Sequence, residues 1–381
     1  MPTVFIPKET VPGETRIAAV PDTVKKMVAS GFSVSVEAGA GAGSFISDAA
    51  FEKAGATVQP DAAKGFAGAD LVAKFHPPSL EEAGRLKQGS LLISFLWPFT
   101  SGELVEKLRV GRVSAFAMDL IPRITRAQKH DALSSQANIA GYKAVILAAD
   151  TAPKLFPMLM TAAGTIRPVR VVIMGAGVAG LQAVATAKRL GAVVEVSDIR
   201  PAVKEQVESL GGKFIEVPTE EVLEDAGGYA KEVSAEFLRK QQEIVRKHVV
   251  QADVVITTAL VPGKPAPRLI SGDMVREMKD GAVIVDLAVE QGGNCELSEP
   301  GRIVSKEGVT IVGLLNIPAL LPVHASEMYA RNILNVFTDV VKEGGVALDF
   351  EDEVVAGSVV THQGEIRHER VAEALGAGGK A

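Results

Sequence analysis

One glycine-rich turn limits what this chain can fold into more than any other feature of its sequence. The apolar run at residues 171–174 leads into Gly175-Ala176-Gly177-Val178-Ala179-Gly180, and a helical pattern follows at residues 181–190. In such a strand–turn–helix unit the first glycine makes the tight turn, the second lets backbone N–H groups approach a pyrophosphate, and the third lets helix and strand pack closely. The phosphates then lie at a helix N-terminus, which favours negative charge. The turn therefore predicts a dinucleotide-binding fold.

The residues after the turn indicate which dinucleotide. A second strand is predicted at residues 192–196 and ends at Ser197 and Asp198. Asp198 lies 18 residues beyond Gly180, near the offset of about 20 expected for the acid that binds the adenosine ribose. A carboxylate there repels a 2′-phosphate and favours NAD over NADP, whereas Arg200 is a residue type that accepts one. The alternative is a glycine-rich turn with a capping aspartate. Strand, turn, helix, strand and acid in register favour nucleotide binding.

Composition and charge narrow the class of protein. The 381 residues are 47% hydrophobic and 23% charged, which is typical of a globular protein long enough for two domains. The net charge of −6 argues against nucleic acid and against direct binding to an anionic membrane. The single cysteine, Cys295, excludes an internal disulfide and a cysteine metal cluster and favours an intracellular protein. No secretory signal opens the chain, and no uncharged run suits a membrane span, so we expect a soluble protein.

Strand and helix patterns alternate along the chain. Besides the runs around the glycine turn, we predict strands at residues 3–6, 32–36, 71–74, 91–95, 113–117, 254–256, 282–285 and 310–312. We predict helices at residues 21–30, 47–54, 135–155 and 326–341, with Ser47 as an N-cap. This alternation indicates parallel, doubly wound sheets. The six histidines show no metal-site spacing, so we predict no metal site, and no nucleophile elbow or cysteine–histidine arrangement is visible.

Motifs spread over nearly the whole chain resemble those of one known family. They are IPKE at residues 6–9, ETRIA at 14–18, VPGKPAP at 261–267 and VDLAVEQGGN at 285–294. They are similar to the alanine dehydrogenase and nicotinamide nucleotide transhydrogenase superfamily. The resemblance implies an α/β fold of two doubly wound, Rossmann-like parallel-sheet domains joined by long helices, with a cleft between them. Residues 1–134 with 326–381 would form the first domain, and residues 135–325 the NAD(H)-binding domain.

Three features distinguish the branches of this superfamily. Residues 122–138, PRITRAQKHDALSSQAN, resemble a signature of the NAD(H)-binding subunit of proton-translocating transhydrogenase that alanine dehydrogenases lack. The insertion at residues 216–236 resembles the mobile loop that closes over NAD(H) in that subunit. Alanine dehydrogenases carry a catalytic histidine just after the strand at 91–95, where this chain has Trp97. However, Arg16 and Lys74 stand where alanine dehydrogenases bind their substrate. An NAD-dependent amino acid dehydrogenase and a non-catalytic NAD-binding protein therefore remain alternatives.

The resemblance also implies site residues. It places Arg123, Gln128, Asp131 and Ser134 beside the nicotinamide, in hydride transfer; the alternatives are a solvated basic loop and helix capping. Residues 286–293 follow a strand and could hold the nicotinamide end, with a β-turn as the alternative. Together with the glycine turn, the predicted cofactor-binding residues are Asn138, Gly175, Ala176, Gly177, Val178, Ala179, Gly180, Ser197, Asp198, Ile199, Arg200, Gly228, Tyr229, Thr258, Ala259 and Leu260.

The implied reaction needs partners that this chain does not contain. Hydride would pass directly from NADH to NADP⁺ bound on another subunit, so no general acid is required and the missing histidine is consistent with the reaction. The resemblance implies a homodimeric subunit, peripheral on the cytoplasmic face of the inner membrane. It would be held there by a membrane-spanning subunit and an NADP(H)-binding subunit, and proton translocation would belong to the membrane partner. No nucleic acid and no direct membrane insertion are expected.

Overall fold

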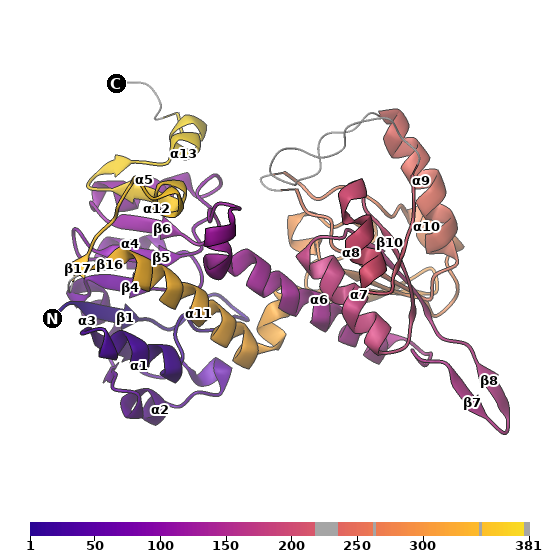
Figure 1. Ribbon diagram of the computed structural model, residues 1–381, viewed down its shortest axis with the longest axis horizontal. Coiled ribbons are helices and arrows are strands. Elements are labelled where there is room, and N and C mark those ends of the chain that lie inside the picture. Colours follow the sequence, from indigo (N-terminus) through magenta and orange to yellow (C-terminus); the bar gives the residue numbers. More distant parts are fainter. Residues whose placement is uncertain (218–234, 262–263, 343–344, 377–381) are drawn as a thin grey trace. The chain divides into compact units, whose positions relative to one another are not determined.

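The computed structural model describes residues 1–217, 235–261, 264–342 and 345–376. The chain divides into two compact units, Met1–Gln136 with Ala319–Ala381, and Ala137–Pro318. Each unit is built around one large β-sheet (Figure 1). Almost all of the predicted mobile loop at residues 216–236, including Gly228 and Tyr229, lies outside the described residues.

The sheet of the first unit has the order β19-β18-β6-β5-β4-β1-β2-β3. Its parallel strands are β1 (Thr3–Ile6), β2 (Ser33–Glu37), β3 (Thr57–Gln59), β4 (Leu71–Ala73), β5 (Leu91–Ser94) and β6 (Ser114–Ala117). Two antiparallel strands close one edge, β18 (Val359–His362) and β19 (Glu365–Ile366). The chain thus returns to this sheet after passing through the second unit.

The sheet of the first unit has a hydrophobic core on each face, and alternate residues of a strand contribute to different cores. Val4 and Ile6 of β1 join a core with α1 (Pro21–Ala29), α2 (Asp48–Lys53) and α11 (Pro322–Val340). Phe5, between them, joins a second core on the opposite face. That core includes residues of α3 (Ala62–Gly68), α4 (Leu80–Arg85), α5 (Gly102–Val110) and α13 (Glu369–Ala374). Because side chains alternate across a strand, a strand buried on both faces must be apolar throughout.

The second unit repeats the same construction. Its sheet has the order β11-β10-β9-β12-β13-β15-β14, and only β14 is antiparallel. The strands are β9 (Arg170–Met174), β10 (Val193–Ser197), β11 (Lys213–Phe214), β12 (Val254–Thr257), β13 (Val283–Asp286), β14 (Arg302–Lys306) and β15 (Val309–Gly313). Val171 and Ile173 pack in a core with α6 (Ala132–Thr151) and α7 (Val178–Arg189). Val172 packs on the other face with α9 (Ala235–Val250) and α10 (Gly272–Glu277).

A two-stranded hairpin projects from the second unit (Figure 1). It consists of β7 (Leu159–Thr161) and β8 (Gly164–Ile166), and all six strand residues are exposed. Leu159, Met160 and Ile166 are 42%, 71% and 47% exposed. The sequence patterns did not predict this hairpin. Among the described residues, no helix is long and apolar enough to cross a bilayer.

The predicted strands and helices are largely confirmed. Every strand predicted from the sequence is present, with its ends within one residue of the prediction. Ser47 caps α2 by accepting a hydrogen bond from the Ala50 N–H, as predicted. The helix predicted to begin at residue 326 begins at Pro322, because proline at the first helical position loses no hydrogen bond. The antiparallel edge strands β14, β18 and β19 were not predicted.

Candidate functional site

The glycine turn between β9 and α7 is tightly packed at its first and third glycines. Gly175 has a φ of 103°, in the left-handed region, and a Cβ there would lie 2.5 Å from Thr258 Oγ1. A Cβ on Gly180 would lie 1.8 Å from the carbonyl oxygen of Gly175. Both positions therefore require glycine for the turn and for the contact between helix and strand.

The second glycine of the turn, Gly177, borders open space instead of closely packed atoms. Gly177 is the N-cap of α7, and no side chain of the described residues caps this helix. A Cβ on Gly177 would meet no described atom within 4 Å. The first N–H groups of a helix have no partner within it, so this end offers donors and a positive dipole end to an anion. An open cradle beside a glycine fits the pyrophosphate of a dinucleotide.

The predicted ribose-binding acid lies against this turn. Asp198 Oδ2 accepts a 2.6 Å hydrogen bond from the backbone N–H of Ala176. The Arg200 side chain is paired with the same carboxylate, since its Nε and NH2 donate to it at 3.0 Å each. The Asp198 and Arg200 side chains are 7% and 17% exposed. The arginine whose charge could favour a 2′-phosphate is thus neutralised by the acid that would repel one.

Two buried polar residues hold the loops that follow β12 and β13. Asp286 accepts hydrogen bonds from Thr257 Oγ1 at 3.0 Å and from Ser298 Oγ at 2.7 Å, and also from the Asn294 N–H. The Asn294 side chain accepts from the Ala259 N–H at 3.0 Å and donates to the Ala259 carbonyl at 2.9 Å. Asp286 thus stabilises the loop after β13 through the hydrogen bonds that it accepts. This role agrees with the β-turn that was the alternative for residues 286–293. The sequence reasoning missed Asn294, although a polar residue directly after two glycines is a signal for such a role.

Thr258 links these loops to the glycine turn. Its backbone N–H donates to the Met174 carbonyl at 2.8 Å, and its Oγ1 lies 3.1 Å from the Gly175 carbonyl oxygen, to which it donates. The predicted cofactor-binding segment at residues 258–260 thus lies beside the turn, within the same unit. Leu260 is 47% exposed. The structure brings together the turn, the acid at the end of β10 and the residues after β12, all at the carboxyl end of the parallel strands, where ligands bind in such sheets.

The predicted nicotinamide residues of the first unit lie around the 3₁₀ helix η2 (Thr125–His130). Arg123 and Gln128 are exposed. Asp131 accepts hydrogen bonds from the Ser134 N–H at 2.9 Å and from Ser134 Oγ at 2.5 Å, at the start of α6. This is the geometry of an N-cap, the alternative considered for both residues. Asn138 belongs to the second unit.

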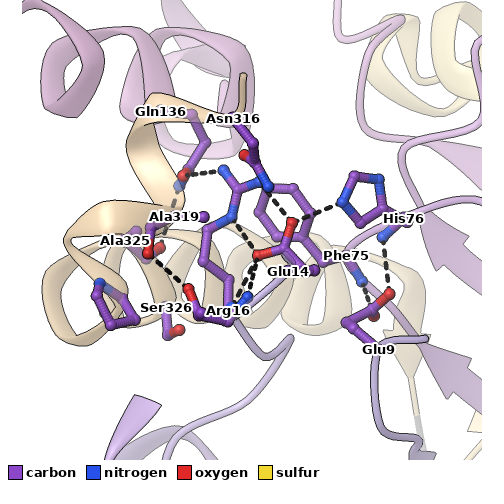
Figure 2. Close-up of polar contacts among 12 residues, drawn as sticks. Glu9, Glu14, Arg16, Phe75, His76, Gln136, Asn316, Ala319, Ala325 and Ser326 are labelled. Carbon is purple, nitrogen blue, oxygen red and sulfur yellow. Dashed lines mark hydrogen bonds and ion pairs between the residues drawn. The ribbon is translucent and has the colours of Figure 1, made fainter. Parts of the chain in front are cut away.

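Arg16 lies in a buried network of charged and polar groups in the first unit (Figure 2). Its Nε and NH2 donate to Glu14 at 2.7 and 2.6 Å, and its NH1 donates to Gln136 at 3.0 Å. The guanidinium carbon also lies 3.7 Å from the centre of the Phe75 ring. Burial alone would raise the pKa of Glu14, but hydrogen bonds from Arg16 and His76 outweigh it and hold that pKa well below its usual range.

Lys74 is likewise engaged by the chain itself. Its side chain is 1% exposed, and its Nζ lies 2.8 Å from Glu82 Oε1. Its carbonyl accepts a 2.8 Å hydrogen bond from the Tyr329 hydroxyl. Burial raises the pKa of nearby Glu9 despite the charge of Lys74 and the N–H groups of Phe75 and His76. Both cations that could serve a small carboxylate substrate are therefore in ion pairs with side chains of this protein.

Trp97 lies just after β5, at the position where the resemblance implies a catalytic histidine in alanine dehydrogenases. Its backbone has a φ of 47°, and its side chain is 45% exposed. The indole stacks on Phe95, with ring centres 5.4 Å apart and an angle of 11° between the planes. The backbone N–H groups of Leu96 and Trp97 donate to Asp119 at 2.7 and 3.0 Å. Burial nevertheless raises the pKa of Asp119 to about 6.

Known proteins share both the sequence and the fold of this chain. Residues 5–140 match the model "Alanine dehydrogenase/PNT, N-terminal domain" and residues 144–369 match "Alanine dehydrogenase/PNT, C-terminal domain". A protein of Rhodospirillum rubrum, the first part of its NAD(P) transhydrogenase subunit alpha, is 52% identical over 374 residues, 96% of this chain and 97% of that protein. The alanine dehydrogenase of Mycobacterium tuberculosis is 30% identical over 380 residues, 98% and 96% of the two chains. The crystal structure of transhydrogenase from Sinorhizobium meliloti has a TM-score of 0.84 at 44% identity, covering 97% of this chain and 99% of that chain.

Proposed function

Because this chain belongs to the alanine dehydrogenase/PNT family, on the branch of the transhydrogenase alpha subunits, we propose that it binds NADH and gives its hydride directly to NADP⁺ on a partner subunit. The observation that carries the proposal is the N-terminus of α7, which no described side chain caps and where Gly177 leaves room for a pyrophosphate. The cofactor supplies the hydride chemistry, whereas the protein binds and orients it. Relatives named as NAD(P) transhydrogenase alpha subunits are 41–52% identical to this chain, more similar than the alanine dehydrogenase at 30%.

The second unit is suited to bind NAD(H) in preference to NADP(H). The adenosine ribose would lie beside Asp198, and the negative charge of this acid would repel the 2′-phosphate of NADP(H). Arg200 is already paired with Asp198 at 3.0 Å and is mostly buried. NADP(H) would therefore bind elsewhere, on the partner subunit.

The exposed side chains around η2 would orient the reacting ring. Arg123 presents fixed N–H donors suited to a carboxamide or a phosphate, and Gln128 can donate and accept at the same time. Both are exposed and so can reach a nucleotide. Asp131 and Ser134 would contact the carboxamide and ribose in addition to capping α6. Holding two nicotinamides in contact supplies most of the acceleration in such a transfer, since no proton moves.

The alternative, an alanine-dehydrogenase-like enzyme, needs free cations and an acid–base group. Arg16 has its NH2 at 2.6 Å from Glu14 and its NH1 at 3.0 Å from Gln136. Lys74 is paired with Glu82 at 2.8 Å. Trp97, which cannot carry a proton to a substrate, stands at the position of the histidine in those enzymes. These contacts favour transhydrogenation over amino acid oxidation.

We further propose that the chain is a homodimer that docks on the cytoplasmic face of the inner membrane through a membrane-spanning subunit and an NADP(H)-binding subunit. The apolar hairpin β7–β8 supports the dimer, since Met160 is 71% exposed and Ile166 47%, and such side chains are usually covered by a partner. Met160→Asp should convert the dimer to a monomer in sedimentation velocity experiments. A wild-type protein that sediments as a monomer at micromolar concentration would contradict the dimer.

One reconstitution tests the proposed function. The purified protein is mixed with an NADP(H)-binding transhydrogenase subunit, and hydride transfer from NADH to NADP⁺ is followed with a spectrally distinct analogue of one nucleotide. We expect transfer only when both proteins are present, and no reduction of NAD⁺ by alanine with this protein alone. Robust alanine oxidation would establish the alternative enzyme. Tight NADH binding without transfer in the mixture would indicate a non-catalytic NAD-binding protein.

A further inference from the structure

Helix α11 presents three polar side chains to the segment that carries Gln128. Asn332, Asn335 and Asp339 are three, four and seven residues apart, so they share one face of the helix. Asn332 Nδ2 and Asn335 Nδ2 both donate to the carbonyl oxygen of Lys129, at 2.9 and 2.8 Å. The carbonyl directly after Gln128 is thus held by two donors.

Asp339 holds the next two side chains of the segment. Its Oδ1 accepts a 2.9 Å hydrogen bond from Lys129 Nζ, and its Oδ2 lies 2.9 Å from His130 Nε2. The His130 side chain is fully buried, whereas that of Asp339 is 28% exposed. Burial lowers the pKa of His130 more than the charge of Asp339 raises it, and Lys129 lowers it further. The imidazole is therefore neutral near pH 7, and Asp339, which can only accept, places its single proton on Nε2.

These contacts leave Gln128 exposed between fixed neighbours. Ala127 is fully buried on one side of it, and the Lys129 carbonyl and His130 are anchored on the other. Arg126 is held separately, by Asp352. A residue with an exposed side chain on a backbone that is pinned before and after it has few conformations to lose when it meets a ligand.

We propose that Asp339 is a positioning residue for hydride transfer: by binding Lys129 and His130 it holds the backbone of η2 so that Gln128 meets the nicotinamide in the reactive arrangement. Asp339 touches neither nucleotide and acts through this segment alone. The inference rests on the proposed function, because it assigns Gln128 to the transfer step. It adds a residue far away in the chain, 210 positions from Lys129.

The test compares Asp339→Ala with Glu327→Ala. Glu327 is a matched control, because it lies on the same helix and its substitution removes the same charge. Its partner is Arg331, at 3.7 Å on the surface, and not the segment around Gln128. We expect Asp339→Ala to lower the rate of hydride transfer in the reconstituted mixture by at least about tenfold, with the dissociation constant of NADH changed less than about twofold. Amide hydrogen exchange of residues 123–131 in the full chain should become faster. Glu327→Ala should change none of the three.

The outcomes separate this proposal from the proposed function. If the wild-type mixture transfers no hydride, the proposed function fails, and unchanged hydrogen exchange in Asp339→Ala would then independently overturn the anchoring. If exchange accelerates but the transfer rate is unchanged, the anchoring exists and the positioning role is wrong. Should Asp339→Ala fold poorly, Asp339→Asn keeps the shape and loses the charge. It should show a smaller fall in transfer rate in the same direction, and an unchanged rate in a folded Asp339→Asn with faster exchange would overturn the proposal.

Discussion

The backbone N–H of Ala176 donates a 2.6 Å hydrogen bond to Asp198, so the glycine turn and the end of β10 share one carboxylate. Arg200 binds the same carboxylate at 3.0 Å and balances its charge. The acid therefore does two things in the structure, because it shapes the turn and it occupies the arginine. Both bear on which nucleotide this unit accepts.

Removing the acid should change nucleotide preference. In Asp198→Ala the guanidinium of Arg200 loses its ion pair with Asp198, and the repulsion of a 2′-phosphate disappears. We expect NADH to bind at least about tenfold more weakly and the preference for NADH over NADPH to shrink by a similar factor. Titrations followed by nucleotide fluorescence measure both dissociation constants. The double variant with Arg200→Ala should bind NADPH more weakly than Asp198→Ala does, because it also lacks the guanidinium that accepts a 2′-phosphate. An unchanged preference in Asp198→Ala would contradict the role of this acid.

The second and third glycines of the turn should respond differently to substitution. Gly177→Val places its side chain in open space, so we expect little change in thermal stability but at least about tenfold weaker NADH binding, as the pyrophosphate loses its approach. In Gly180→Ala the new methyl group meets the Gly175 carbonyl at 1.8 Å, which should lower the free energy of unfolding by about 1–3 kcal/mol. Thermal unfolding and NADH titration of both variants check this. Normal NADH binding by a folded Gly177→Val would argue against the pyrophosphate site.

Asp119 should give the protein a distinct pH dependence. Its pKa is raised from 3.8 to about 6, so between these values the folded state keeps a proton that the unfolded state has lost. Its contribution to the free energy of unfolding therefore falls as pH rises from about 4 to about 6, by up to ~3 kcal/mol, and is level above that. Asp119→Asn should remove this dependence on pH. Urea unfolding of the variant and the wild type across the range from about pH 4 to about pH 6 measures the free energy of unfolding of each.

The same titration should be visible in fluorescence. Trp97 is the only tryptophan of the chain, and its backbone N–H donates to Asp119 at 3.0 Å. We expect the wild-type emission to change with a midpoint near pH 6 and the emission of Asp119→Asn to lack that transition. A transition that persists in the variant would have to come from another group.

Glu14 should be essential for stability. Glu14→Gln removes the carboxylate that pairs with the guanidinium of Arg16, which is 5% exposed, and removing one partner of a buried ion pair costs about 3–5 kcal/mol. Because the pKa of Glu14 is depressed, its stabilisation is complete above the ordinary value of 4.5 and is lost as pH falls below it. Urea unfolding at pH 7 and at acid pH measures both effects. Glu81→Gln, which breaks an exposed pair with Arg85, is the control and should change stability by less than about 1 kcal/mol.

The elements that local sequence defines were the ones predicted. The strand β1 is apolar at three successive positions, Val4, Phe5 and Ile6, because both of its faces are covered. Ser47 lies directly before α2 and accepts a hydrogen bond from a backbone N–H of that helix. The antiparallel strand β18 was not predicted, since its pairing with β6 joins residues such as Ala115 and Thr361 that lie far apart in the chain. Strand direction at a sheet edge depends on that partner and not on the residues of the strand itself.

The sequence alone determined the glycine turn, the strand and helix around it and the acid at a fixed distance beyond, because backbone dihedral preferences and side-chain periodicity act over a few residues. Only the tertiary structure decided which charges meet. Arg16 is paired with Glu14, Arg200 with Asp198, and His130 with Asp339, 209 residues away. Hydrogen bonds and ion pairs form only when two groups lie within a few ångströms of each other. The separation of two residues in the sequence does not determine their distance in space, which depends on how distant segments pack.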